Sequence, residues 1–247
     1  MKTVLITGAT SGIGKATAVA LAEKKYKLIL CGRNQAVLDE LKATLATHVH
    51  TCSFDVRDKQ EVFAQINNLP EDFINIDILI NNAGNAHGLA TFDQADLEDL
   101  EAMIDINVKG LIYVSKAVLP HMPKNARSHI INISSIAGKE VYLNAATYCA
   151  SKAAVEALTK GMRIDLLPLG IKVTGIAPGA VETNFSLVRF KGDSERAQKV
   201  YEGYQPLTPE DVAETILFAI EQPTHVQLAD ITILPKAQAS ATNMYKK

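Results

Sequence analysis

Tyr148 and Lys152 are two residues whose types and spacing could move a proton. They stand four residues apart near the start of a predicted helix over 147–167, so their side chains share one helix face. A free phenol has a pKa of about 10 and is a weak base at neutral pH. A nearby ammonium group and the positive end of a helix both favour the phenolate. We therefore expect Lys152 to lower the pKa of Tyr148, which can then act as a general acid or base.

Ser135 is a third candidate, thirteen residues before Tyr148 and directly after a predicted strand over 129–134. Ligands of open α/β sheets bind beyond the carboxyl ends of the strands, and a hydroxyl group there could orient a substrate oxygen. Each feature is weak by itself, because Tyr-x-x-x-Lys pairs and single serines also occur on ordinary protein surfaces. Their assignment to catalysis depends on what the rest of the chain provides.

The segment 7–14, TGATSGIG, follows a predicted strand and opens a predicted helix. Its glycines allow a tight turn, and the helix N-terminus offers free N–H groups to a pyrophosphate. A P-loop is excluded, because Ala9 stands where that motif needs its first glycine and Ala16 replaces the Ser or Thr that holds Mg²⁺. The spacing also differs from G-x-G-x-x-G, so a purely structural turn stays an alternative to a dinucleotide site.

The second predicted strand ends in 31–34, CGRN, without an acidic residue. An NAD site would place Asp or Glu here to accept hydrogen bonds from the ribose hydroxyl groups. Arg33 instead offers a planar cation that suits a 2′-phosphate, and Asn34 follows it. The pattern therefore favours NADP(H), the alternative being a solvated arginine at a helix start.

Short runs rich in Val, Ile and Leu alternate along the chain with longer amphipathic stretches. We predict strands over 3–7, 26–31, 49–55, 77–81, 129–134, 172–177 and 228–234. We predict helices over 12–24, 36–46, 59–69, 97–121, 147–167 and 209–222. This alternation predicts right-handed βαβ crossovers and one doubly wound parallel sheet in a single α/β domain over 1–247. The insertion 182–205 is either a lid over a site or a plain surface loop.

The composition excludes several other classes of protein. Apolar residues make up 47% of the 247 residues and charged residues 21%, which excludes a disordered or collagen-like chain. A net charge of −2 predicts no nucleic-acid partner, and no apolar run is long enough to span a membrane. The three cysteines form neither a disulfide framework nor a zinc pattern, which fits the cytoplasm. We expect no metal, since the pair His48 and His50 lacks a third ligand.

Taken together, the chain resembles the short-chain dehydrogenase/reductase superfamily. The matching segments, in chain order, are 7–14 (TGATSGIG), 55–56 (DV), 81–84 (NNAG), Asn107, Ser135, Tyr148 with Lys152, and 178–179 (PG) followed by Thr183. The resemblance implies a Rossmann-type, seven-stranded parallel sheet with helices on both faces. It also implies reversible hydride transfer between a nicotinamide and an alcohol or carbonyl group.

The same resemblance implies roles for individual residues. Tyr148 would be the acid/base and Ser135 would bind the reacting oxygen. Lys152 would hold the nicotinamide ribose and lower the pKa of Tyr148, and Asn107 would position a water in a proton relay. The residues expected to bind the coenzyme are Gly8, Ala9, Thr10, Ser11, Gly12, Ile13, Gly14, Arg33, Asn34, Asp55, Val56, Asn82, Ala83, Gly84, Tyr148, Lys152, Pro178, Gly179, Val181 and Thr183.

Within the superfamily, 76–79 (IDIL), 188–193 (VRFKGD) and 207–211 (LTPED) are similar to segments of NADP-dependent 3-hydroxy acid dehydrogenases. Those enzymes oxidise serine, allo-threonine and related 3-hydroxy acids, and can reduce the corresponding 3-oxo acids. A carboxylate on the substrate needs a cation, for which Arg189 and Lys191 are the candidates. Solvated loop charges are the alternative for both.

Two other functions remain alternatives: another carbonyl reductase of the superfamily, such as a 3-oxoacyl carrier-protein reductase, and a dinucleotide-binding regulator without catalysis. The predicted helices 97–121 and 147–167 carry apolar residues on more than one face, among them Met103, Leu111 and Val155. Extra apolar stripes predict pairing of helices between subunits, and the resemblance implies a homotetramer, with a homodimer as the alternative.

Overall fold

One parallel sheet forms the centre of the molecule. The structure is a computed structural model and describes residues 1–124 and 127–247. Within these residues, seven strands lie side by side in the order β3-β2-β1-β4-β5-β6-β7, all parallel. The strands are β1 (Thr3–Thr7), β2 (Lys27–Gly32), β3 (Val49–Ser53), β4 (Ile78–Asn81), β5 (His129–Ile133), β6 (Lys172–Pro178) and β7 (Asp230–Ile233). The expected Rossmann-type fold is confirmed.

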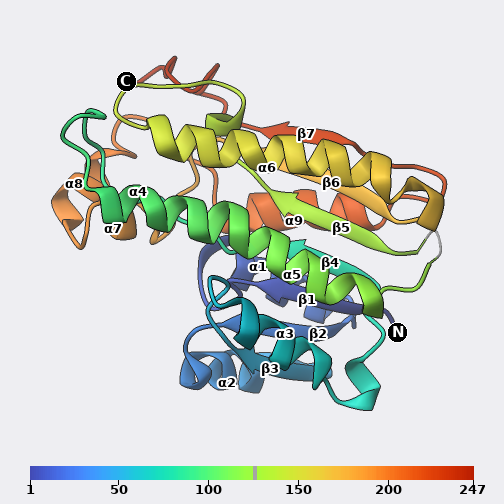
Figure 1. The fold of residues 1–247 in the computed structure, drawn as a ribbon. Coiled ribbons are helices and arrows are strands. Elements are labelled where there is room, and N and C mark those ends of the chain that lie inside the picture. The colour runs from blue at the N-terminus through green and yellow to red at the C-terminus, as the bar shows by residue number, and fades with distance from the viewer. Residues whose placement is uncertain (125–126) are drawn as a thin grey trace.

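Helices cover both faces of this sheet (Figure 1). They are α1 (Gly12–Glu23), α2 (Gln35–Thr44), α3 (Lys59–Asn67), α4 (Leu97–Ile104), α5 (Leu111–Val118), α6 (Ala146–Asp165), α7 (Phe185–Arg189), α8 (Ser194–Lys199) and α9 (Pro209–Ile220). Helices α3, α4, α5 and α6 lie on one face, and α1, α2 and α9 on the other (Figure 1). No helix of the described residues is both long and apolar enough to cross a lipid bilayer.

Alternating strand residues build a separate core on each face. In β1, Val4 and Ile6 pack with α1, α2 and α9, whereas Leu5 between them packs with α3 and α5. All three side chains are fully buried. This explains why the strands read as nearly continuous apolar runs, because both of their faces are covered.

The predicted helix over 97–121 is continuous in the structure but not regular, since a π-helical turn over Asp105–Gly110 lies between α4 and α5. Such turns insert one residue into a helix and are frequent at functional sites. Two close contacts involve residues of the turn Asp105–Gly110. Asn107 hydrogen-bonds to the backbone of Asn85, and Gly110 approaches Val56 so closely that a Cβ would lie 2.8 Å from Cγ2 of Val56.

The strand order reverses between β1 and β4, which are neighbours in the sheet. A crevice opens beyond the carboxyl ends of strands at such a switch point, and it is the usual ligand site of doubly wound sheets. Thr7 joins the two strand ends here, because its hydroxyl group accepts hydrogen bonds from the backbone N–H groups of Asn82 and Ala83, at 3.0 and 2.9 Å. The fold therefore brings the loops after β1 and β4 together at one edge.

Candidate active site

A cavity of about 590 Å³ runs along the carboxyl edge of the sheet. The predicted site residues that line it are Gly8, Thr10, Ser11, Gly12, Ile13, Arg33, Asp55, Val56, Asn82, Ala83, Gly84, Ser135, Tyr148, Lys152, Pro178, Gly179, Val181, Thr183 and Arg189. They come from the segments that follow six strands, including the starts of α1 and α6 and the helix α7, which explains why they are far apart in sequence and close in space.

Other predicted residues lie outside the lining. Ala9 is fully buried, and its N–H donates to the carbonyl of Cys31 at 3.0 Å. Gly14 packs directly on the loop, where an added Cβ would lie 2.2 Å from the carbonyl oxygen of Gly8. Asn34 caps α2 by accepting a hydrogen bond from the N–H of Val37. These three residues shape or support the site from behind.

Lys191 is not a ligand of this cavity. Its ammonium group lies 2.9 Å from a carboxylate oxygen of Asp99 and 3.9 Å from one of Asp96, on the surface beside α4. Lys191 does not line the cavity, so the structure favours Arg189 over Lys191 as the group that meets a substrate carboxylate. Lys191 follows the end of α7 and has a left-handed backbone, with φ of 52°.

The loop after β1 has the geometry that a bound pyrophosphate requires. Gly8 and Gly12 have φ of 64° and 49°, in the left-handed region that favours glycine. Ser11 precedes α1 without capping it through its side chain, and the first turn of α1 holds no acidic residue. The free N–H groups and the positive end of α1 thus face the cavity, where they suit phosphate oxygens.

The ends of β2 and β3 supply the charges expected near an adenosine ribose. Arg33 is exposed at the cavity rim, and Gly32 lies so close to the loop after β1 that a Cβ would be 3.0 Å from Cγ2 of Thr10. Asp55 is held by Arg57, whose guanidinium group donates to both carboxylate oxygens. Burial raises the pKa of Asp55, but the hydrogen bonds and charge of Arg57 outweigh this and lower it overall. The residues present fit a dinucleotide with a 2′-phosphate.

Tyr148, in the first turn of α6, is 7% exposed and faces the cavity. Burial is the largest effect on its phenol and raises the pKa above the ordinary value, and Tyr142 raises it further. A hydrogen bond with Ser135 and the charge of Arg189 act in the opposite direction. The guanidinium carbon of Arg189 lies 5.6 Å from the centre of the Tyr148 ring. The groups that stabilise a phenolate here are therefore Ser135 and Arg189.

Lys152 follows Tyr148 by one turn, but its ammonium group points to the sheet and donates to the carbonyl of Ile133 at 3.1 Å. A Cβ on Gly84 would lie 3.1 Å from this ammonium group, which places it against the loop after β4. Burial lowers the pKa of Lys152 to about 8, and Glu156 acts to raise it. The charge of Lys152 is not among the effects that shift the pKa of Tyr148 in this structure, so the expectation that Lys152 lowers that pKa stays a prediction.

Asn107 sits in the π-helical turn and is 2% exposed. Its side chain accepts a hydrogen bond from the N–H of Asn85 at 2.9 Å, donates to the carbonyl of Asn85 at 2.8 Å and donates to Ser151 at 3.0 Å. Asn107 thereby fixes the loop after β4 against α6. Its role in a proton relay stays a prediction.

The insertion 182–205 folds over the cavity rather than away from it, with α7 and α8 inside it. Arg189 of α7 is half-buried; its guanidinium group donates to the carbonyl of Gly88 at 3.2 Å and to the phenol oxygen of Tyr142 at 3.0 Å. A side cavity of about 230 Å³ shares Tyr142, Tyr148 and Arg189 with the main one. Arg189 thus lies between two hollow regions beside the acid/base candidate.

The last residues of the chain contribute to the cavity, although no sequence motif predicted this. Gln238 is buried; its side-chain oxygen accepts from the N–H of Ala180 at 2.9 Å, and its amide donates to Ser240. A Cβ on Gly179 would lie 2.2 Å from this oxygen, so the loop after β6 and the C-terminal segment are in intimate contact. Met244 and Lys246 also line the cavity. No sequence pattern predicted these contacts, because they form only when the C-terminal segment packs against the loop after β6 in the folded chain.

A doubly wound parallel sheet with a glycine-rich turn at its switch point and a buried Tyr and Lys in one cavity defines a nucleotide-dependent oxidoreductase. The family model of the short chain dehydrogenases matches residues 2–193. The chain belongs to this family and is an enzyme of the dehydrogenase class.

Named relatives match over nearly the whole length. The chain is 40% identical over 251 residues to an NADP-dependent 3-hydroxy acid dehydrogenase of Schizosaccharomyces pombe, covering 100% of this chain and 97% of the relative. It is 43% identical over 239 residues to the NADP-dependent 3-hydroxy acid dehydrogenase YdfG of Salmonella typhi, covering 96% of each. Among solved structures, the closed form of a serine dehydrogenase complexed with NADP⁺ has a TM-score of 0.94 at 40% identity, covering 99% of this chain and 100% of that one.

Proposed function

We propose that the protein is an NADP-dependent dehydrogenase that oxidises 3-hydroxy acids such as serine or allo-threonine and reduces 3-oxo acids in the reverse direction. The observation that carries the proposal is the position of Arg189, a half-buried cation 5.6 Å from the Tyr148 ring centre and on the cavity wall. Arg189 offers a binding site for a carboxylate next to Tyr148, where the reacting hydroxyl group would lie. The full-length similarity to 3-hydroxy acid dehydrogenases supports the same substrate class.

The residues that would hold the coenzyme are distributed along the main cavity. The N-terminus of α1 and the loop 8–14 would bind the pyrophosphate, and Arg33 the 2′-phosphate. Asp55 and Val56 would contact the adenine, and Asn82, Ala83 and Gly84 would line the ribose side. Pro178 to Thr183 would cover the nicotinamide, which supplies the hydride acceptor or donor when bound.

Tyr148 would move the proton. In oxidation its phenolate takes the proton of the substrate hydroxyl group, and in reduction the phenol returns it. Ser135 would donate a hydrogen bond to the same oxygen, on which charge develops in the transition state. Lys152 would hold the ribose hydroxyl groups and Asn107 a water of the proton relay.

Arg189 would bind the carboxylate of the substrate. Two of the five N–H donors of a guanidinium group are used by Gly88 and Tyr142, which fix its plane and leave others free. A planar donor pair held in this way suits a carboxylate better than a lysine would. We further propose that the segment 182–205, which carries Arg189, closes over the substrate as a lid.

The test is reduction of coenzyme by a panel of 3-hydroxy acids, run with NADP⁺ and with NAD⁺. We expect turnover of serine, allo-threonine and related acids with NADP⁺, and a much higher KM for NAD⁺. A preference for 3-oxoacyl thioesters on a carrier protein, with no oxidation of free acids, would indicate the alternative reductase. No turnover of any alcohol or carbonyl substrate would indicate a non-catalytic binding protein.

We also propose that the protein is a cytoplasmic homotetramer, with a homodimer as the alternative. Met103, Leu111 and Val155, on which the expectation partly rested, are buried within the chain and do not support it. Exposed apolar side chains remain on the same helices: Leu97 and Ile112 of α4 and α5, and Ile164 of α6. Sedimentation velocity at micromolar concentration tests this, and a monomer would contradict it.

A further inference from the structure

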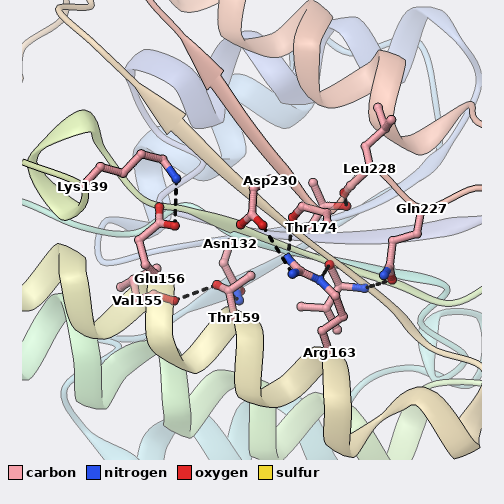
Figure 2. Close-up of polar contacts among 12 residues, drawn as sticks. Asn132, Lys139, Val155, Glu156, Thr159, Arg163, Thr174, Gln227, Leu228 and Asp230 are labelled. Carbon is pink, nitrogen blue, oxygen red and sulfur yellow. Dashed lines mark hydrogen bonds and ion pairs between the residues drawn. The ribbon is translucent and has the colours of Figure 1, made fainter. Parts of the chain in front are cut away.

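Glu156 is a buried acid that the proposed chemistry does not use. It lies on α6 four residues after Lys152 and eight after Tyr148, so the three side chains follow one another along the same helix face. Glu156 is only 7% exposed. Acidic residues are rarely buried to this extent unless they are paired. Figure 2 shows its carboxylate pointing to the ammonium group of Lys139, with which it forms an ion pair of 3.1 Å.

Lys139 directly follows the short 3₁₀ turn Ile136–Gly138 in the loop that carries Ser135, and this loop lies directly on the Lys152 turn of α6. The hydroxyl group of Ser134 donates to the carbonyl of Lys152 at 3.3 Å. A Cβ on Gly138 would lie 2.7 Å from the same carbonyl oxygen. The ion pair of Lys139 and Glu156 is therefore the last of three contacts that hold the Ser135 loop against the helix bearing Tyr148 and Lys152.

The other carboxylate oxygen of Glu156 argues against a purely stabilising role. Oε1 is buried and has no hydrogen-bond partner among the described residues. A buried carboxylate that is satisfied on one side only costs free energy relative to a neutral side chain. Its charge does act on Lys152, since burial lowers the pKa of that ammonium group and Glu156 opposes this effect.

Lys152 forms no ion pair among the described residues, and the groups that lie against its side chain are neutral. The π-helical turn offers the neutral amide of Asn107, β5 offers the carbonyl of Ile133, and α6 offers Tyr148, which is a neutral phenol until it loses its proton. The positive charge of Lys139 would disfavour the ammonium form of Lys152, but Lys139 is paired with the carboxylate of Glu156. Within the described residues, Glu156 is the acid that acts on Lys152.

We propose that Glu156 is a positioning residue, which fixes the Ser135 loop on α6 through Lys139 and keeps Lys152 in its ammonium form. This inference rests on the proposed function, in which Lys152 acts as a cation beside the reacting groups. The polar residues further along α6 serve a different purpose. Arg163 forms an ion pair with Asp230 of β7 at 3.4 Å and bonds the carbonyls of Val173 and Ala229, which anchors the far end of the helix to the sheet (Figure 2).

The experiment compares three variants with the parent enzyme. Glu156→Gln removes the charge and keeps the shape, Lys139→Met removes the loop contact but keeps the carboxylate, and Asp230→Asn removes the charge of the remote ion pair as a matched control. Two measurements are made on each variant. The first is kcat/KM for reduction of the preferred carbonyl substrate between pH 6 and 10. The second is the unfolding temperature of the protein without coenzyme between pH 7 and 9.5.

For Glu156→Gln we expect the alkaline limb of the kcat/KM profile to move to lower pH by about one unit, because loss of an adjacent opposite charge lowers the pKa of an ammonium group. The unfolding temperature should fall at pH 7, where Lys152 is charged in the folded parent. The deficit should narrow toward pH 9.5, above the Lys152 pKa of about 8, where the folded state no longer holds that charge.

Lys139→Met should lower kcat/KM at every pH without moving the alkaline limb of its profile to lower pH. Asp230→Asn should change neither the position of that limb nor the pH dependence of the unfolding temperature. The proposal is overturned if Glu156→Gln scales the whole profile without a shift, or if its unfolding deficit is the same at every pH. Failure of the proposed function is distinct, since it appears as absent turnover in the parent. The unfolding measurements then decide the role of Glu156 by themselves.

Discussion

The guanidinium carbon of Arg189 lies 5.6 Å from the ring centre of Tyr148, and the same distance from that of Tyr142. A cation at this range from an aromatic ring is attracted to it, and it also favours the phenolate over the phenol. The charge that acts on the acid/base candidate thus comes from the insertion over the site, across the cavity from α6. One side chain can therefore influence both the binding of an anionic substrate and the protonation of Tyr148.

Arg189→Met should lower kcat/KM for a 3-hydroxy acid by about 10- to 100-fold, because a hydrogen bond between charged groups contributes about 1.5–3 kcal/mol. The loss for an uncharged secondary alcohol should be smaller, since only the effect on Tyr148 remains. Steady-state kinetics with both substrates measure the difference. Arg196→Met is the control, because Arg196 is exposed on α8 and stacks on Phe190. Equal losses on both substrates would contradict a carboxylate-binding role.

Tyr148→Phe should lower kcat by about 10²- to 10⁴-fold, the usual contribution of a positioned general acid or base. Coenzyme affinity should change little, and the fold should be retained because the ring still packs against Phe185, whose centre is 5.7 Å away. Single-turnover rates and the fluorescence of bound NADPH measure the two effects. A variant that retained most of its turnover would remove Tyr148 from the mechanism.

Gln238→Ala should raise the KM for coenzyme several-fold and lower the free energy of unfolding by about 1–3 kcal/mol, because the N–H of Ala180 loses its buried acceptor. Chemical denaturation and coenzyme titration measure both. Gln222→Ala is a matched control, since Gln222 makes a single surface hydrogen bond to the carbonyl of Phe218. If the two variants behave alike, the C-terminal segment does not position the loop after β6.

His129 should make the protein sensitive to acid. Burial lowers its pKa from 6.5 to about 3, and Lys172 and Lys2 contribute. Nε2 lies 2.8 Å from the hydroxyl oxygen of Thr174, whereas Nδ1 has no partner among the described residues. The unfolded chain takes up a proton below pH 6.5 and the folded chain does not, so stability is full above pH 6.5. It should then fall toward pH 3, by at most about 1.4 kcal/mol per pH unit.

Denaturation of His129→Gln between pH 7 and 4 checks this expectation. The variant should be less stable at pH 7 but lose less stability on acidification than the parent. His225→Gln, a change at an exposed position, should follow the parent. A parallel decline in all three proteins would assign the acid sensitivity to other groups.

Much of the fold was predictable because both faces of the sheet are covered. The predicted strands match the observed ones within two residues at every end, since apolar runs such as 4–6 and 78–80 have no polar interruption. Periodicity does not give the order of the strands, and the family resemblance implied only a Rossmann-type, seven-stranded parallel sheet; the order is seen in the structure. The π-helical turn around Asn107 escaped prediction, because an extra residue inside a helix leaves the apolar pattern on both sides intact.

The residues of the candidate site that belong to sequence motifs were predictable. Residues that reach the site only through the packing of distant segments were not. Ser135, Tyr148 and Lys152 line one cavity as the resemblance implied. The direction of Lys152 was not predictable from its spacing, because the four-residue interval fixes the helix face but not the χ angles that carry its ammonium group to Ile133. Gln238 and Glu156 stand in no motif, and only the packing of their segments gives them partners.

The π-helical turn between α4 and α5 holds one residue more than a regular α-helix would, so the length of this segment should tolerate no deletion. Each residue of an α-helix advances by about 100°, so deleting one codon within Asp105–Gly110 would merge the two helices into one regular rod. Everything on one side of the deletion would then rotate by that angle, and Asn107 would swing away from Asn85. We expect in-frame codon deletions here to abolish activity while leaving a folded protein, unlike point substitutions at the exposed Lys109.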